Sequence, residues 1–247
     1  ALKTIAQHPQ GVPHGLLGTL QLNRDSLDLL VDKGLLRVQT RRRTPPLRHG
    51  GWLAQPELAL NAEQRAAYEA IRAGFGAFRA FLLAGVTGSG KTEVYLQLIR
   101  ETLQAGKQAL VLIPEINLGP QTLARFEQRF NARIALLHSN VNDRERLDAW
   151  LAARDGEADI VIGDRSALFT PLARPGLIIV DEEHDASYKQ QEGLRYHARD
   201  LALVRAHQEH LPIVLGSATP SLESLHNAHA GRYALLKLTQ RAGGAQP

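Results

Sequence analysis

The sequence contains no cysteine and no methionine among its 247 residues. Without cysteine, a disulfide framework and a zinc site with thiolate ligands are both excluded within this chain. No apolar run approaches membrane-spanning length and no secretory signal opens the chain, so we expect a cytoplasmic protein with no membrane partner. Methionine is absent even at position 1, where alanine stands. We therefore expect the chain to be a piece of a longer protein.

A phosphate-binding loop is predicted at residues 85–92, where the sequence GVTGSGKT fits the pattern GxxxxGK[ST]. An apolar run over 81–84 precedes it and a helical pattern over 93–100 follows it, as the chemistry requires. Glycines let the backbone N–H groups face the phosphates, and Lys91 adds a point charge. The residues expected to bind ATP or ADP are Gly85, Thr87, Gly88, Ser89, Gly90, Lys91 and Thr92. The Thr92 hydroxyl is also expected to contact Mg²⁺.

An acidic run, Asp-Glu-Glu-His at 181–184, follows the apolar stretch 177–180 and supplies the second half of such a site. Asp181 is expected to hold Mg²⁺, directly or through water, and Glu182 to orient and deprotonate the attacking water. Lys91 and Glu182 are therefore the predicted catalytic residues. An acidic cluster after a strand is commonly a solvated loop or helix cap, but its position some ninety residues after a phosphate loop favours the nucleotide site.

Positive charge is concentrated near the N-terminus. Residues 1–50 contain eight Lys or Arg against three Asp, whereas residues 51–247 contain 21 basic and 22 acidic groups. The order of helix, turn, helix, short strand and basic loop in residues 1–45 predicts a winged-helix domain. Its basic tip would be Arg41, Arg42 and Arg43, which suit contacts with nucleic-acid phosphates. Residues 46–57 are expected to be a linker, and a solvated linker is also the alternative interpretation of the arginine run.

Alternating apolar strands and amphipathic helices follow from residue 58 onward, a pattern typical of a parallel sheet with helices on both faces. The predicted fold class is therefore α/β. The predicted strands are 81–84, 109–113, 134–138, 159–162, 177–180, 213–215 and 233–238. In such sheets ligands bind beyond the carboxyl ends of the strands. The phosphate loop, the acidic run and the sequence GSAT at 216–219 all follow strand ends, so we expect them to meet at one edge.

The segment between Asp181 and Asp200 mixes aromatic, basic and amide side chains in a predicted polar loop. Rings can stack on bases and exposed basic side chains can contact phosphates, so this composition suits single-stranded nucleic acid without sequence preference. The residues expected to contact DNA, or to couple its binding to hydrolysis, are Tyr188, Lys189, Gln190, Arg195, Tyr196 and His197. The alternative is that the two tyrosines only pack the loop onto the sheet.

Several further sequences carry a resemblance to a known family. They are PEI at 114–116 with Pro120 and Gln121, RSALF at 165–169, SAT at 217–219 and above all YKQQEGLRYHARD at 188–200. Together with the two nucleotide motifs, they make the chain resemble the bacterial replication-restart DNA helicases of superfamily two over nearly its whole length. The resemblance implies a winged-helix domain over residues 1 to about 45, a RecA-like first motor lobe over 58–240 and the start of the exit from that lobe over 241–247.

The resemblance also implies roles for individual residues. Gln64 would bind the adenine base, and a glutamine amide has both the donor and the acceptor for that. Arg165 and Ser166 would contact DNA, whereas Asp164, where the family usually has threonine, would repel DNA phosphates. The residues implied to link the ATP state to movement are His184, Ser217 and Thr219.

For the full-length protein, the resemblance implies ATP hydrolysis coupled to 3′–5′ translocation on single-stranded DNA, and the restart of stalled replication forks. The implied partners are single-stranded and forked DNA, primosome proteins and single-strand-binding protein. Zinc and a second motor lobe are implied only outside this chain. Because that lobe would supply an arginine finger, we expect weak or undetectable hydrolysis by this chain alone. The alternative interpretations are an RNA-directed DExH motor, a restriction-enzyme motor lobe, or a non-catalytic module that binds forked DNA.

Overall fold

The computed structural model describes Ile5, Val12, Leu20 and residues 22–37, 52–139 and 141–242. The chain divides into two compact units, Ala1–Pro45 and Pro46–Pro247, which are described separately. The predicted basic tip at 41–43 lies outside the described residues, so the winged-helix domain stays a prediction.

One helix of the N-terminal unit is described, α2, Arg24–Asp32. It begins after Asn23, whose side chain accepts a hydrogen bond from the backbone N–H of Asp25 at 3.0 Å. Gly34 ends it in a left-handed conformation with φ of 67°, which a glycine adopts without steric cost. An asparagine before a helix and a glycine after it are common start and stop signals. Residues 35–37, where the predicted short strand would begin, are not in a strand.

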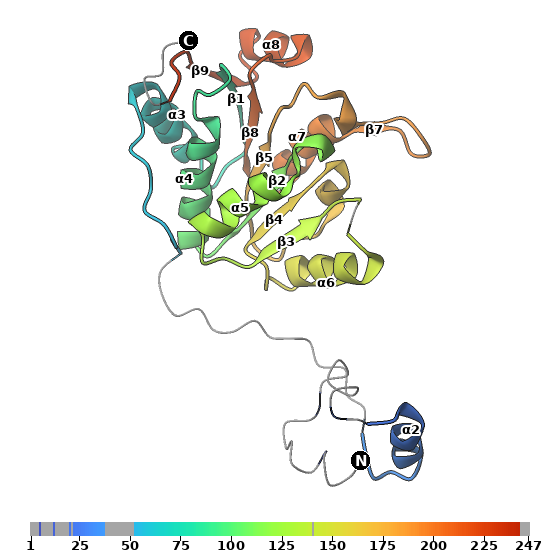
Figure 1. Cartoon of the computed structure of the whole chain (residues 1–247). Helices are drawn as coiled ribbons and strands as arrows, with labels where there is room; N and C mark the ends of the chain where they lie inside the picture. The colour runs from blue at the N-terminus through green and yellow to red at the C-terminus, as the bar shows by residue number, and fades with distance from the viewer. Residues whose placement is uncertain are drawn as a thin grey trace. The chain divides into compact units, whose positions relative to one another are not determined.

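The second unit is built on a seven-stranded sheet in which every described pair of neighbouring strands is parallel (Figure 1). Across the sheet the strands are β3 (Ile134–Leu137), β4 (Ile160–Gly163), β2 (Gln108–Leu112), β5 (Pro175–Val180), β8 (Pro212–Ser217), β1 (Arg79–Gly85) and β9 (Ala234–Leu238). All seven predicted strands are present, with ends that differ by at most two residues, and the α/β fold class is confirmed.

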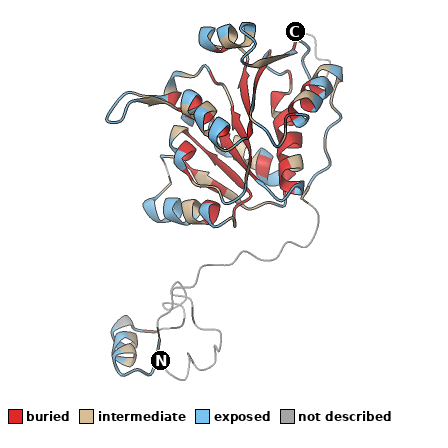
Figure 2. Cartoon of the chain, turned by 180° about the vertical axis from the view of Figure 1, so that it is seen from behind, coloured by how far each residue is buried: buried red, intermediate tan, exposed pale blue. Residues whose placement is uncertain are grey.

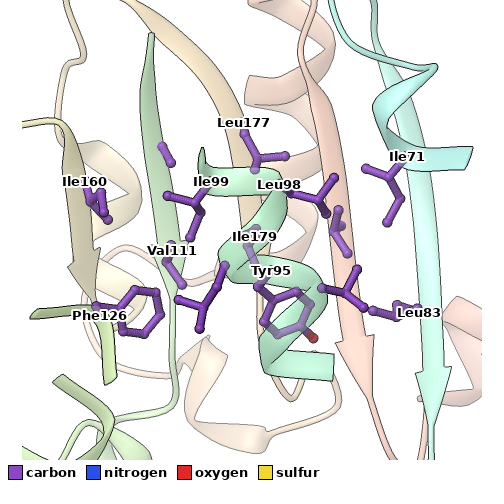
Figure 3. Close-up of a cluster of buried hydrophobic side chains, with 14 of the residues drawn as sticks. Ile71, Leu83, Tyr95, Leu98, Ile99, Val111, Phe126, Ile160, Leu177 and Ile179 are labelled. Atoms are coloured by element: carbon purple, nitrogen blue, oxygen red, sulfur yellow. The ribbon is translucent and has the colours of Figure 1, made fainter. Parts of the chain in front are cut away.

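Helices cover both faces of this sheet, and the strands are buried between them (Figure 2). One face carries α3 (Ala62–Arg72), α4 (Lys91–Gln104) and α5 (Pro120–Arg129); the other carries α6 (Asp143–Arg154), α7 (Ala198–Gln208) and α8 (Leu222–His229). Successive residues of a strand point to opposite faces, so Leu83 joins the first apolar cluster and Leu82 the second. Figure 3 shows the first cluster, where α4 packs on β1 and β5.

The loops that carry the predicted motifs lie side by side because of the strand order. The phosphate loop follows β1, the acidic run follows β5, and GSAT lies at the end of β8, which pairs with both of those strands. Three short 3-10 helices, η2 (Glu115–Asn117), η3 (Arg165–Phe169) and η4 (Ala186–Tyr188), follow the ends of β2, β4 and β5. The expectation that the motifs meet at one edge of the sheet therefore agrees with the topology.

Residues 52–60 lie along the second unit before α3 begins. Leu53 forms an isolated antiparallel bridge with Phe130, and the Ala54 N–H donates to the Arg129 carbonyl at 2.9 Å. The described part of the segment predicted as a linker therefore packs against the lobe, and the domain boundaries stay a prediction. No helix among the described residues is long and apolar enough to cross a membrane.

Candidate nucleotide site

The phosphate loop turns directly into α4, whose first residue is Lys91. Gly88 and Gly90 have φ values of 79° and 80°, a left-handed region that suits glycine. A Cβ at Gly90 would lie 2.3 Å from Nε2 of Gln64, so this position also lacks room for a side chain. The buried Lys91 ammonium donates to the Gly85 carbonyl at 2.9 Å and so lies across the loop. The helix dipole and the N–H groups at the N-terminal end of α4 make this end of the helix suited to binding an anion.

Asp181 lies directly after β5 and faces the same space. Its carboxylate accepts a hydrogen bond from the Tyr95 hydroxyl at 3.0 Å. Burial raises the pKa of Asp181 above its ordinary value, and the neighbouring Glu182 carboxylate adds to the rise, whereas Tyr95 and Lys91 oppose it. A desolvated carboxylate beside an ammonium is a group that a divalent cation would stabilise.

A cavity of about 670 Å³ joins the two motifs. Its lining includes residues 87–93 of the phosphate loop and α4, together with Gln64, Asp181 and Glu182. The structure therefore brings Lys91 and the acidic pair together, as the sequence predicts. The donor set also fits Mg²⁺, because the Thr92 hydroxyl and the Asp181 carboxylate are both oxygen ligands on the wall of one cavity.

Glu182 has an unusual backbone. Its φ is 45°, which costs a residue other than glycine about 1 kcal/mol or more and is found most often at functional sites. Its carboxylate lies 3.6 Å from Nδ1 of His184 and is about a quarter exposed. Glu182 thus lies on the wall of the cavity with a strained backbone, and its role in activating water stays a prediction.

Gln64 lies at the cavity, but its amide is already bonded within the chain. Its Oε1 accepts from the Asn61 N–H at 2.9 Å, and its Nε2 donates to the Ser89 carbonyl at 2.8 Å. Asn61 and Gln64 form a capping box at the start of α3. Gln64 therefore ties α3 to the phosphate loop, and its recognition of adenine stays a prediction.

The imidazole of His184 joins the acidic run to the end of β8. Its Nδ1 lies 2.7 Å from Oγ of Ser217, and its Nε2 lies 3.2 Å from Oγ1 of Thr219. The Ser217 hydroxyl also accepts from the Thr219 N–H at 3.0 Å. The three residues predicted to link nucleotide state to movement thus form one hydrogen-bonded unit.

Glu183 is a residue that the sequence analysis missed. It is fully buried, and its carboxylate accepts from the Arg199 guanidinium, the Ser221 N–H, and the hydroxyls of Ser221 and Ser224. Residues 181–184 are four polar residues in a row, and the sequence does not indicate which of their side chains is buried. Tyr95 was missed as well, although it stands four residues after Lys91 and so shares its helix face.

The predicted polar loop after the acidic run contains a short hairpin, with strands β6 (Lys189–Gln190) and β7 (Tyr196–His197). Arg195 lies between them, and side chains of β6 and β7 with Arg195 line a cavity of about 490 Å³. Tyr196 packs edge-on against Phe169 with ring centroids 5.1 Å apart.

Two expectations about DNA contacts need correction. Tyr188 has no exposed surface, and its hydroxyl donates to the backbone carbonyl of Asp181 at 2.7 Å, so its ring is not free to stack on a base. Asp164 is buried and caps η3, because its carboxylate accepts from both the N–H and the hydroxyl of Ser166 at 2.7 Å. It therefore does not present a free acid to phosphates. Arg165 donates to the Ser187 carbonyl at 2.9 Å, which joins η3 to the segment before the hairpin.

A sequence profile of DEAD/DEAH box helicases matches residues 61–228, about two thirds of the chain. The chain belongs to the DEAD/DEAH box helicase family. Among the relatives of this helicase chain, the replication restart protein PriA of Haemophilus influenzae is 55% identical over 192 residues, which cover 78% of the chain and 26% of the relative. The PriA protein of Bacillus subtilis is 45% identical over 219 residues, which cover 87% of the chain and 27% of the relative.

A solved structure of RecG bound to a three-way DNA junction matches the helicase chain with a TM-score of 0.58 and 25% identity, covering 77% of the chain and 25% of RecG. These matches confirm the predicted motor-lobe fold and the resemblance to replication-restart helicases. The chain spans about a quarter of the length of each of these relatives.

Proposed function

We propose that this chain is the nucleotide-binding motor lobe of an ATP-dependent DNA helicase that restarts replication. One observation carries the proposal: Lys91 and Asp181, ninety residues apart in sequence, line the same cavity with the phosphate loop between them. The acids, the ammonium and the start of α4 then surround a space suited to a polyphosphate and its metal ion.

Each residue has a role in this proposal. The loop N–H groups and Lys91 bind the phosphates, with the Lys91 ammonium exchanging its bond to the Gly85 carbonyl for one to a phosphate oxygen. Thr92 and Asp181 would hold Mg²⁺, which neutralises charge on the phosphate oxygens when it is bound. Glu182 accepts a proton from the attacking water and orients it. A change of nucleotide state in the site is then transmitted to the end of β8 by His184, Ser217 and Thr219.

The substrate and partners of the longer protein form the second part of the proposal. The replication-restart relatives, together with RecG solved on a three-way DNA junction, support DNA rather than RNA as the partner. For the longer protein we propose 3′–5′ translocation on single-stranded DNA and recognition of forked DNA. Primosome proteins and single-strand-binding protein are proposed partners, in the cytoplasm. Zinc is proposed only outside this chain. Turnover requires the closing of a second lobe, so the isolated chain should bind nucleotide but hydrolyse it weakly.

A titration of fluorescent ADP with and without Mg²⁺ tests the nucleotide site. We expect saturable binding that Mg²⁺ strengthens, and no detectable binding by Lys91→Ala. Lys107→Ala is the matched control, because Lys107 is exposed and does not line the cavity. Unchanged binding by Lys91→Ala would refute the site. Addition of single-stranded DNA and then RNA to the same samples tests the choice of nucleic acid, and an equal or greater effect of RNA would contradict the DNA assignment.

A further inference from the structure

We propose that Tyr95 is a positioning residue for the metal-binding acid, and that Gly216 is glycine because the Tyr95 hydroxyl occupies the space of its side chain. The inference rests on the proposed function, in which Asp181 holds Mg²⁺. It adds a residue of α4 and a residue of β8 to that site.

The contact between Tyr95 and Asp181 joins a rigid, buried donor to a half-buried acceptor. The tyrosine is 2% exposed, and its ring lies in the apolar cluster near Leu83 and Ile179, with its oxygen at one end (Figure 3). That oxygen is 3.0 Å from Oδ1 of Asp181. A ring packed on both sides cannot follow a moving carboxylate, so the hydroxyl fixes the rotation of the acid.

The same hydroxyl explains the glycine at 216. The φ of Gly216 lies outside the left-handed region, so its backbone conformation does not require glycine. A Cβ at this position would lie 1.6 Å from the Tyr95 hydroxyl oxygen and 2.8 Å from the ring carbon that carries it, and both distances are impossible for real atoms. It would lie 3.4 Å from the Asp181 carboxylate, which is ordinary contact. Tyr95 is therefore the group that excludes a side chain from Gly216.

Gly216 is also joined to the acidic run through its backbone. Its carbonyl accepts from the Glu183 N–H at 2.9 Å, and the next residue, Ser217, contacts His184. The end of β8 is therefore bonded to the acidic run and also lies against the Tyr95 hydroxyl that contacts Asp181. In this arrangement the Tyr95 hydroxyl lies between the GSAT segment and Asp181, the acid proposed to hold Mg²⁺.

Tyr95→Phe tests the inference, because it removes the hydroxyl and keeps the ring. Fluorescent ADP is titrated without metal, and Mg²⁺ is then titrated at fixed nucleotide. We expect the half-saturating Mg²⁺ concentration to rise about tenfold, equivalent to ~1.4 kcal/mol for a hydrogen bond to a charged group, with metal-free ADP affinity unchanged. Tyr68→Phe is the matched control, because its hydroxyl bonds Glu101 outside the cavity, and its Mg²⁺ response should equal that of the parent.

Three outcomes would overturn the inference. A parental Mg²⁺ response in Tyr95→Phe would show that the hydroxyl does not position the acid. An equal loss of metal-free ADP binding would show general damage to the site instead. A parent protein whose ADP binding ignores Mg²⁺ would refute the metal role of Asp181 itself, and with it both proposals.

A double-mutant cycle tests the link to Gly216. Gly216→Ala should lower the unfolding temperature of the parent by several degrees and weaken its Mg²⁺ response. In a Tyr95→Leu background the ring and hydroxyl are gone, so the added methyl group should be tolerated and the two effects should not add. An equal cost of Gly216→Ala in both backgrounds would show that another group excludes the side chain, and would overturn this part of the inference.

Discussion

Glu183→Gln should destabilise the protein, whereas the same substitution at the neighbouring Glu182 should not. The Glu183 carboxylate is fully buried. Its Oε1 accepts from the Ser221 N–H at 2.7 Å, and its Oε2 accepts from Arg199 at 3.1 Å and from the hydroxyls of Ser221 and Ser224 at 3.0 and 2.8 Å. Every contact of this side chain is therefore with a donor.

A glutamine cannot satisfy this set of donors. It has one acceptor oxygen, so its amide nitrogen would face either the Ser221 N–H or the Arg199 guanidinium. One charge-assisted bond is lost, and the buried Arg199 keeps the exposed Asp200 as its only carboxylate partner among the described residues, together with its bond to the Ser221 hydroxyl. The expected cost is about 3 kcal/mol. For a chain of this size, that cost lowers the unfolding temperature by roughly 6–12 °C.

Urea denaturation followed by circular dichroism measures the difference. Glu182→Gln is the matched control, because its side chain is about a quarter exposed and has fewer contacts, so its free energy of unfolding should stay within about 0.5 kcal/mol of the parent. Equal stability of the two variants would refute the assignment of Glu183 as a structural anchor. For hydrolysis by the longer protein, the proposed function predicts the reverse order, because Glu182→Gln would remove the proposed water-activating group.

Three further predictions concern stability. Leu98→Ala removes a fully buried side chain from the cluster between α4 and the sheet, and should cost about 3 kcal/mol in urea denaturation; a loss under about 1 kcal/mol would contradict tight packing there. Arg129→Leu leaves the buried Glu93 carboxylate without its two-bond partner and should cost about 3 kcal/mol, more than Arg129→Lys, which keeps the charge; equal losses would contradict the pairing. Burial lowers the pKa of His197 below its ordinary value of 6.5, with Arg199 as the second cause, so its stabilising contribution is present above pH 6.5 and lost as the pH falls. His197→Asn should therefore flatten the fall of the unfolding temperature between about pH 7 and 5.5, and an unchanged slope would count against it.

The sheet and the nucleotide motifs were predictable because their signals are local. The strands of the seven-stranded sheet are short, mainly apolar runs, such as 177–180 before Asp181, and a short buried apolar run of this kind is typical of a parallel strand. The phosphate loop requires glycines at fixed spacing before a helix, so its conformation follows from the sequence itself.

The parts that were missed depend on side-chain contacts that only the folded chain creates. Whether Tyr188 stacks on a base or packs inside is decided by the Asp181 carbonyl that meets its hydroxyl. The role of Asp164 depends on the hydrogen bond that its carboxylate accepts from the Ser166 N–H, which forms only in the turn of η3. Glu183 and Tyr95 are polar groups whose partners come from other elements, and no spacing rule identifies such partners.

The position of β8 explains why coupling residues gather around GSAT. This strand pairs with β1, where Ala84 lies opposite Ser217, and with β5, where Val180 lies opposite Leu215. Its end therefore reaches the phosphate loop on one side and the acidic run on the other. The backbone hydrogen bonds between paired strands oppose sliding of one strand along its neighbour. A displacement at GSAT is therefore accommodated more easily by side chains near the strand ends than by the strands themselves. His184, which follows β5 and bonds Ser217, is such a side chain. Tyr95 reaches the same place from α4 and bonds Asp181. If Asp181 holds Mg²⁺ as proposed, this strand order gives a change at that acid a route to the end of β8 through side chains, without requiring the sheet to deform.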